Sequence, residues 1–125
     1  MILDTNAISA LSEGNPNILG ALRSSRTHSI PVIVIGEFKF GLQNSRQRIA
    51  LAQWLSALEG QMEILSIDKS TADCYAEVRN ELRQSDKPIP SNYIWIAALA
   101  RQHGLSILSR DTHFDNVTGI VRTSW

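Results

Sequence analysis

The sequence has a single cysteine, Cys74, no excess of charge of either sign and no long apolar stretch. One cysteine cannot form an internal disulfide, which favours a reducing compartment. The 12 basic and 12 acidic residues balance, which argues against a protein held to nucleic acid mainly by bulk charge. No apolar run reaches the roughly 18 residues that suggest a membrane span, and we see no signal peptide. We therefore expect a cytoplasmic protein with no membrane association.

What the sequence does contain is typical of a globular protein. Apolar residues make up 43% of the chain and charged residues 19%. A chain of 125 residues should bury about two-thirds of its unfolded surface. We expect a single domain over residues 1–125.

Short apolar runs rich in β-branched residues alternate with segments of helical periodicity. The expected strands cover residues 1–4, 29–33, 62–67, 105–109 and a weaker 119–123. The expected helical faces are Ile18, Leu19 and Leu22; Ile35, Phe38 and Leu42; Leu51, Leu55 and Leu58; and Tyr75, Val78 and Leu82. Asn15 before Pro16 and Asp68 predict helix starts, and Ser91 is expected to cap a last, mostly apolar helix that ends at Gly104. This order predicts a parallel sheet covered on both faces, with a ligand site beyond the carboxyl ends of its strands.

Four acids fall where such a site is expected. Asp4 ends the first strand, and Glu37 lies four residues past the second, in the first turn of the next helix. Asp111 lies two residues past the fourth strand, and Asp115 follows four later. Taken singly, these acids also fit turn, cap or solvated positions. Together they predict a shared acidic cluster.

Carboxylates that converge repel one another unless a cation lies among them. Their oxygens are hard donors, and no cysteine or histidine pair has zinc spacing, so the fitting ion is Mg²⁺ or Mn²⁺. Such ions contact phosphates and lower the pKa of a bound water, which is the chemistry of phosphodiester hydrolysis. A haloacid-dehalogenase-like phosphatase needs a second aspartate where this chain has Asn6, and a receiver domain needs an early acidic pair, so we reject both.

Three segments together resemble the PIN domain family: LDTN at 3–6, GEFKFG at 36–41, and IPSNYIWIAALARQHGLSILSRDTHFDNV at 89–117. The size resembles VapC-type toxins of bacterial toxin–antitoxin pairs. The resemblance implies a three-layer α/β fold with a parallel sheet of order 3-2-1-4-5. It also implies a Mg²⁺-dependent endoribonuclease that acts on RNA, a homodimer and an antitoxin partner.

The resemblance assigns roles to individual residues. It implies Asp4, Glu37 and Asp111 as catalytic acids, and Asp4, Asp111 and Asp115 as metal ligands. Thr5, Asn6, Asn92 and Ser109 match neighbouring polar positions that orient ligands or water. Arg110 and Lys39 are candidate substrate contacts, and we expect Arg46 and Arg48 near the same opening.

One position departs from the family. Members usually have Asn-Asp at the start of the last helix, where this chain has Asn92-Tyr93. A neutral phenol supplies neither the charge nor the two donor oxygens of a carboxylate. Tyr93 is therefore a tolerated variant, the mark of an inactive relative, or an inactivating change that removes toxicity. The primary hypothesis is a toxin ribonuclease weakened or inactivated by Tyr93. The alternative is an inactive module that binds antitoxin or RNA without cleavage.

Overall fold

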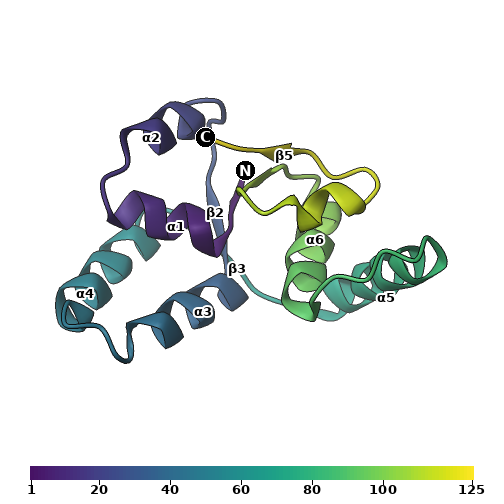
Figure 1. Ribbon diagram of the computed structural model, residues 1–125, viewed down its shortest axis with the longest axis horizontal. Coiled ribbons are helices and arrows are strands. Elements are labelled where there is room, and N and C mark those ends of the chain that lie inside the picture. The colour runs from purple at the N-terminus through teal and green to yellow at the C-terminus, as the bar shows by residue number, and fades with distance from the viewer.

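The computed structural model describes residues 1–125 and contains a five-stranded sheet with helices on both faces (Figure 1). The strands are β1 (Ile2–Leu3), β2 (Ser29–Pro31), β3 (Glu63–Leu65), β4 (Ile107–Leu108) and β5 (Arg122–Thr123). The helices are α1 (Thr5–Ser12), α2 (Pro16–Leu22), α3 (Val32–Leu42), α4 (Arg48–Glu59), α5 (Lys69–Gln84) and α6 (Ser91–His103), followed by the 3₁₀ helix η1 (Thr112–Asn116). None of these helices combines the length and apolarity that crossing a bilayer requires.

All neighbouring strands are parallel, and their order is β3-β2-β1-β4-β5, which confirms the predicted sheet. From β1 the chain moves outward to β2 and β3, and then returns across the sheet to β4. Because parallel crossovers are right-handed, this reversal puts α1 to α4 on one face and α5 and α6 on the other (Figure 1). The order reverses between β1 and β4, which is where ligands bind in open α/β sheets.

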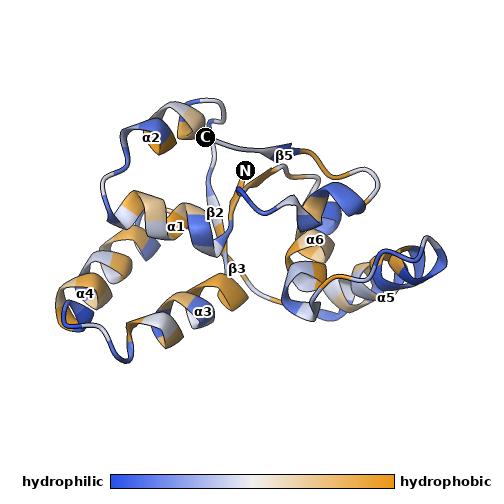
Figure 2. Cartoon of the chain, in the orientation of Figure 1, coloured by the Kyte–Doolittle hydropathy of each residue, from blue (hydrophilic) through white to orange (hydrophobic).

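The central strands are fixed by burial. Ile2 and Leu3 of β1 and Ile107 and Leu108 of β4 are fully buried, and Figure 2 shows apolar residues gathered on the central strands. Burying one such side chain contributes about 1.5–3 kcal/mol. The points at which β1 and β4 end are therefore held firmly, although each strand is short.

Several helix boundaries agree with the sequence prediction. The Asn15 side chain accepts a hydrogen bond from the Asn17 amide at 2.9 Å and caps α2. Asp68 forms a capping box with Thr71 at the start of α5. Gly104 ends α6 with a left-handed φ of 64°, a conformation that glycine adopts without strain.

Other boundaries differ from the prediction. The chain enters α1 directly after Asp4, and this helix was not predicted. The second strand ends at Pro31, and Val32 and Ile33, expected in the strand, begin α3. An apolar run of this kind fits a buried helix as well as a strand. As a result Glu37 lies in the second turn of α3, not in the first.

The start of α6 also needs a correction. Pro90, with extended φ and ψ of −58° and 147°, is the residue before the helix, and Ser91 is the first helical residue without a capping hydrogen bond. Proline is suited to this position because its ring already fixes φ near the observed value, so little further backbone entropy is lost. Tyr93 lies in the first turn, as expected.

Candidate active site

Asp4 is the buried acid of the site. It follows β1 directly, precedes α1 and is only 3% exposed. Its Oδ2 accepts a hydrogen bond of 2.7 Å from the Ser109 hydroxyl. Burial raises the pKa of Asp4, the Ser109 hydrogen bond opposes that rise, and the charges of Glu37 and Asp111 add to it. These two acids therefore act on Asp4 through space.

A polar network ties the ends of β1 and β4 together. The fully buried Ser109 hydroxyl accepts hydrogen bonds from the Asn6 side chain at 3.2 Å and from the Asp111 amide at 2.9 Å. The Asn6 carbonyl oxygen accepts from the Arg110 amide at 3.3 Å. Asn6 and Ser109 thus hold Asp4 and the segment after β4 in a fixed relation.

Glu37 connects three helices. Its Oε2 accepts a hydrogen bond of 2.7 Å from the Thr5 hydroxyl in α1, and its Oε1 accepts one from the Asn92 side chain in α6. Both partners are neutral donors, so they orient the carboxylate and leave its charge uncompensated. Thr5 and Asn92 therefore both lie beside Glu37 and orient its carboxylate.

Asp111 is engaged differently. Its Oδ1 accepts from the His113 amide at 3.0 Å, which caps η1, and lies 2.7 Å from His113 Nδ1, although the ring nitrogen is not oriented to form a hydrogen bond. Burial alone would raise the pKa of Asp111, but interactions with Tyr93 and with the amide and ring of His113 lower it overall. Asp111 thus has protein partners for its charge.

Tyr93 occupies the middle of the acidic group. Interaction of its hydroxyl with Asp111 raises the pKa of the Tyr93 phenol, together with burial and the charges of Asp111, Asp4 and Glu37. Its ring lies edge-on to Phe114, with centroids 5.4 Å apart, and 4.8 Å from the ring of His113. The phenol is therefore neutral and held among the acids.

Asp115 is placed away from these acids. Both of its oxygens accept hydrogen bonds from the Arg122 guanidinium, at 2.8 and 2.9 Å, and half of its side chain is exposed. The Arg122 hydrogen bonds lower the pKa of Asp115. This placement does not match the expected role of Asp115 as a metal ligand. Arg122 was not noticed in the sequence, because its partner lies across an irregular turn.

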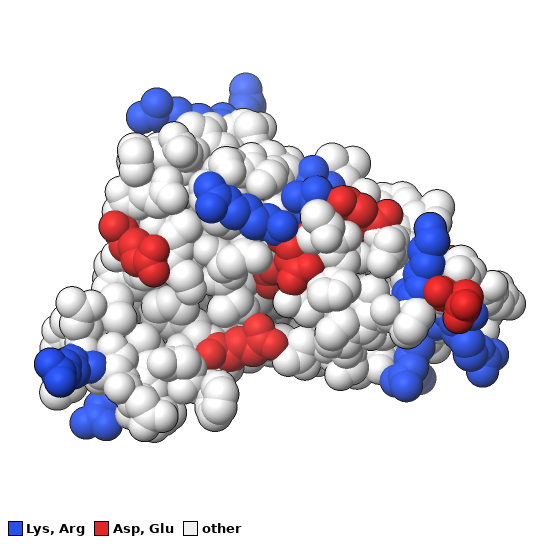
Figure 3. Space-filling view, viewed as in Figure 1, with Lys and Arg blue, Asp and Glu red and all other residues white.

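Asp4 and Glu37 line a cavity of about 500 Å³ at the carboxyl ends of the strands, whereas Asp111 and Asp115 do not line it. Its lining includes Asp4, Glu37, Tyr93, Arg110 and Trp125. Figure 3 shows acidic side chains gathered at the centre of this face, with basic side chains beside them. Trp125 was not predicted at this site, since no periodicity near the end of the sequence marks it.

The other expected cations lie elsewhere. Lys39 and Arg46 are exposed and do not line the acidic cavity, and Arg48 lines a separate shallow hollow on α4. Of the four cations expected at the opening, only Arg110 is found there. Exposure of Lys39 follows from its place on α3, two positions after Glu37, where it must point away from that face.

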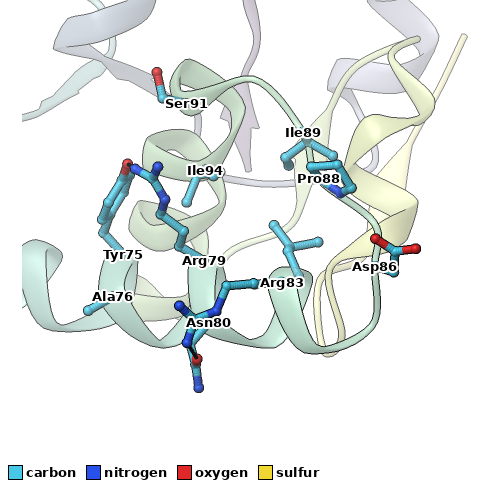
Figure 4. Close-up of a pocket in the computed structure, with 11 residues that line it drawn as sticks. Tyr75, Ala76, Arg79, Asn80, Arg83, Asp86, Pro88, Ile89, Ser91 and Ile94 are labelled. Atoms are coloured by element: carbon cyan, nitrogen blue, oxygen red, sulfur yellow. Dashed lines mark hydrogen bonds between the residues drawn. The ribbon is translucent and has the colours of Figure 1, made fainter.

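A second cavity, of about 610 Å³, lies between α5 and the segment that leads into α6 (Figure 4). Apolar side chains such as Ile89 and Ile94 line it, with Arg79 and Arg83 at its rim. Arg79 donates a hydrogen bond of 2.6 Å to the Tyr75 hydroxyl. The only acidic residue that lines this second cavity is Asp86, so the cavity lacks the group of carboxylates expected for phosphodiester hydrolysis.

The donor set can be tested against a metal ion. No group of three or more histidine, cysteine or acidic side chains is arranged to hold an ion together. Asp4 and Glu37 nevertheless present hard oxygens to one cavity, and Mg²⁺ is commonly held by one or two carboxylates with water and substrate phosphates. The residues present therefore fit such an ion, with the neutral Tyr93 beside them.

Several proteins match this sequence over most of their own length. Ribonuclease VapC4 of Mycobacterium tuberculosis is 32% identical over 87 residues, which cover 68% of this chain and 67% of the relative. Toxin FitB of Neisseria gonorrhoeae is 30% identical over 122 residues, or 90% of this chain and 88% of the relative.

Solved structures share the fold. A chain of FitAcB from Neisseria gonorrhoeae superposes with a TM-score of 0.85 at 26% identity, covering 97% of this chain and 94% of that one. A chain of VapBC2 from Rickettsia felis, in a complex bound to a DNA fragment from their promoter, superposes with a TM-score of 0.88 at 22% identity. The match covers 99% of this chain and 97% of that one.

The fold and the site define a class: an α/β protein whose sheet reverses its strand order beside a group of carboxylates. The PIN domain family model matches residues 1–120, so the chain belongs to the PIN domain family, with relatives of the VapC type.

Proposed function

We propose that this protein is a cytoplasmic endoribonuclease toxin of a type II toxin–antitoxin pair, dependent on Mg²⁺ or Mn²⁺, in which Tyr93 weakens or abolishes cleavage. The observation that supports it most is Asp4. This acid is buried at the end of β1, and burial and the charges of Glu37 and Asp111 raise its pKa. Such an arrangement is unfavourable for folding, and acids with perturbed pKa values cluster at functional sites.

Asp4 would hold the ion, with Asp111 as a second ligand once it is released from Tyr93. When bound, the ion would stabilise charge on the phosphate and lower the pKa of a bound water. Asn6 and Ser109 orient Asp4. Asp115, already paired with Arg122, is left out of this set.

Glu37 is suited to accept a proton from the attacking water, because Thr5 and Asn92 orient it without neutralising it. The water oxygen forms a bond to phosphorus as the bond to the 3′ oxygen breaks, and that oxygen takes up a proton. The products carry a 5′-phosphate and a 3′-hydroxyl. Arg110 is the candidate contact for the phosphate.

Tyr93 opposes this reaction in two ways. It supplies no charge at the first turn of α6, and its hydroxyl takes up Asp111. Losing one preorganised electrostatic contact lowers a rate by on the order of 10²–10³.

The test is Tyr93→Asp, assayed with purified protein on single-stranded RNA in Mg²⁺ and by growth arrest after induction. We expect cleavage to rise by on the order of 10²–10³. Tyr93→Phe is the matched control, because it frees Asp111 from the hydroxyl but adds no charge, and it should restore far less activity. If Tyr93→Asp is as inert as the parent in both assays, the inactivating role of Tyr93 is wrong.

The alternative function is binding without cleavage. The engagement of Asp111 by Tyr93 and His113 favours it, because one expected ligand is already satisfied within the protein. An RNA-binding titration separates the two functions: an inert Tyr93→Asp variant that still binds RNA or an antitoxin would support the binding module.

An antitoxin and a second copy of this chain are the proposed protein partners. The relatives of known structure include VapBC and FitAcB assemblies. Large apolar side chains on α3 and α4 are exposed here, with Phe40 80% and Ile49 70% accessible, which is consistent with protein contacts. Light scattering of the purified chain would test the homodimer.

A further inference from the structure

Trp125 contacts Arg110 in two ways at the rim of the acidic cavity. The main-chain oxygen of Trp125 accepts hydrogen bonds from Arg110 Nε at 3.1 Å and from Nη2 at 2.9 Å. The Arg110 guanidinium also lies over the indole, 4.7 Å from the ring centroid. One edge and one face of the guanidinium are thereby fixed.

The indole is itself held in place. Trp125 is partly buried and packs against the hydrophobic core, and its Nε1 is buried without a hydrogen-bond partner. The ring therefore provides a rigid apolar support for Arg110. An arginine on the surface without such support samples many rotamers, which opposes binding of a ligand in one geometry.

Arg110 is also the one cation that lines the cavity, beside Asp4, Glu13 and Glu37. Its Nη1 makes no hydrogen bond within the chain, and its amide is fixed by Asn6. A guanidinium held along one edge keeps its remaining N–H groups for an anion, and phosphate is the anion that this fork matches. The chain has zero net charge, so bulk charge provides little attraction between RNA and an acidic cavity.

We propose that Trp125 is a positioning residue for RNA binding: it holds Arg110 so that the free N–H groups of the guanidinium contact a backbone phosphate at the acidic cavity. This inference rests on the proposed function, because it takes single-stranded RNA as the ligand. It gives Trp125 no contact with the reacting atoms.

The experiment measures binding of a fluorescent single-stranded RNA of mixed sequence by anisotropy in Ca²⁺, and cleavage in Mg²⁺ in the Tyr93→Asp background. We expect Trp125→Ala and Arg110→Ala each to weaken RNA binding by roughly fivefold to tenfold, in line with the loss of one oriented charged contact. In the cleaving background both should raise KM more than they lower kcat. Trp125→Phe, which keeps an aromatic face, should restore binding to within about twofold of the parent.

The double variant Trp125→Ala with Arg110→Ala tests whether Trp125 acts on RNA binding through Arg110 or only by packing in the core. If Trp125 acts through Arg110, Trp125→Ala should have little further effect once Arg110→Ala is present. Arg110→Ala should also reduce the salt dependence of log K by about 0.7, as expected for one lost phosphate contact to a single strand.

Arg79→Ala is the matched control. Arg79 forms the other cation–π pair of the chain, over Tyr75 at 5.8 Å, on α5 beside the second cavity (Figure 4). Removing it deletes the same charge and the same kind of contact, and RNA binding should not change. Thermal melting of each variant checks that it folds.

Distinct outcomes would overturn the two proposals. Unchanged RNA binding in Trp125→Ala, or an effect that persists in full in the Arg110→Ala background, would overturn the positioning role alone. If neither the parent nor Tyr93→Asp binds or cleaves RNA, the ribonuclease function fails, and the role of Trp125 in it fails too.

Discussion

The acids that follow β1 or lie on α3 differ in their partners from the acids that follow β4. On the side of β1 and α3, Asp4 and Glu37 are oriented by Ser109, Thr5 and Asn92, all neutral donors, and no cation of the chain is paired with them. On the side of β4, the carboxylates of Asp111 and Asp115 have partners that can donate a proton or carry positive charge.

Asp111 lies against Tyr93 and His113, and Asp115 is paired with Arg122. The comparison shows that the acids on the β1 side have no cationic partner, whereas those on the β4 side are satisfied by other groups of the chain. Tyr93 accounts for the difference at Asp111, and Arg122 for the difference at Asp115.

The largest effect is expected at Asp4. In the Tyr93→Asp background, Asp4→Asn should lower Mg²⁺-dependent RNA cleavage by at least on the order of 10²–10³, because the proposed mechanism makes the buried acid the central ligand. Asp73→Asn removes the same charge from the exposed face of α5 and should leave cleavage unchanged. Cleavage by the Asp4→Asn protein that persists and resists a chelator would refute this role.

A smaller effect is expected from the residue that orients Asp4. Ser109→Ala should reduce cleavage by about 10–100-fold, the usual effect of losing a hydrogen-bond partner of a ligand. It should also move the acid limb of the pH–rate profile to higher pH, because the Ser109 hydrogen bond lowers the pKa of Asp4. Ser106→Ala, just before β4, makes the same chemical change and serves as the control. An unshifted pH profile would argue against the pairing.

Much of this arrangement could be predicted from the sequence. The strand order and the edge that carries the acids follow from the alternation of apolar runs and from Asp4 and Asp111 standing just after two of them. The start of α3 could not be predicted, because the apolar run at 30–35 suits a strand or a buried helix equally.

Two side-chain pairings at the site could not be predicted from the sequence either. Arg122 meets Asp115, and Trp125 meets Arg110, only because β5 lies beside β4 in the folded sheet. Such pairings depend on tertiary packing, and no local spacing in the sequence marks them.

Asp4 differs from Asp111 and Asp115 in how its ionisation affects stability, because its pKa is raised in the folded chain and theirs are lowered. The pKa of Asp4 is higher in the folded chain than the usual 3.8, so the folded state binds more protons between the two values and loses stability as pH rises through that range. Asp4→Asn should therefore raise the free energy of unfolding at pH 7 by about 1 kcal/mol, since a neutral amide can still accept from Ser109.

This gain should shrink as the pH falls toward 4, which urea unfolding at a series of pH values would measure. Asp73→Asn again provides the comparison. A loss of stability at pH 7 in Asp4→Asn would show that the ionised acid is favourable in the fold, contrary to the burial argument.

The smallest effect is expected at Asp115. Since Arg122 takes both of its oxygens, Asp115→Asn in the Tyr93→Asp background should change cleavage by less than about threefold, as for an exposed ion pair. A loss comparable to that of Asp4→Asn would mean that Asp115 leaves Arg122 and joins the metal site after all.

The most direct measurement is a calorimetric titration of Mn²⁺ into the parent chain, Tyr93→Asp, and Tyr93→Asp combined with Asp4→Asn. If Asp4, Glu37 and Asp111 form one acidic site that Tyr93 obstructs, Tyr93→Asp should bind Mn²⁺ more tightly than the parent, and the added Asp4→Asn change should abolish that binding. Equal affinity in all three proteins, or no binding by Tyr93→Asp, would contradict a shared metal site at the ends of β1 and β4.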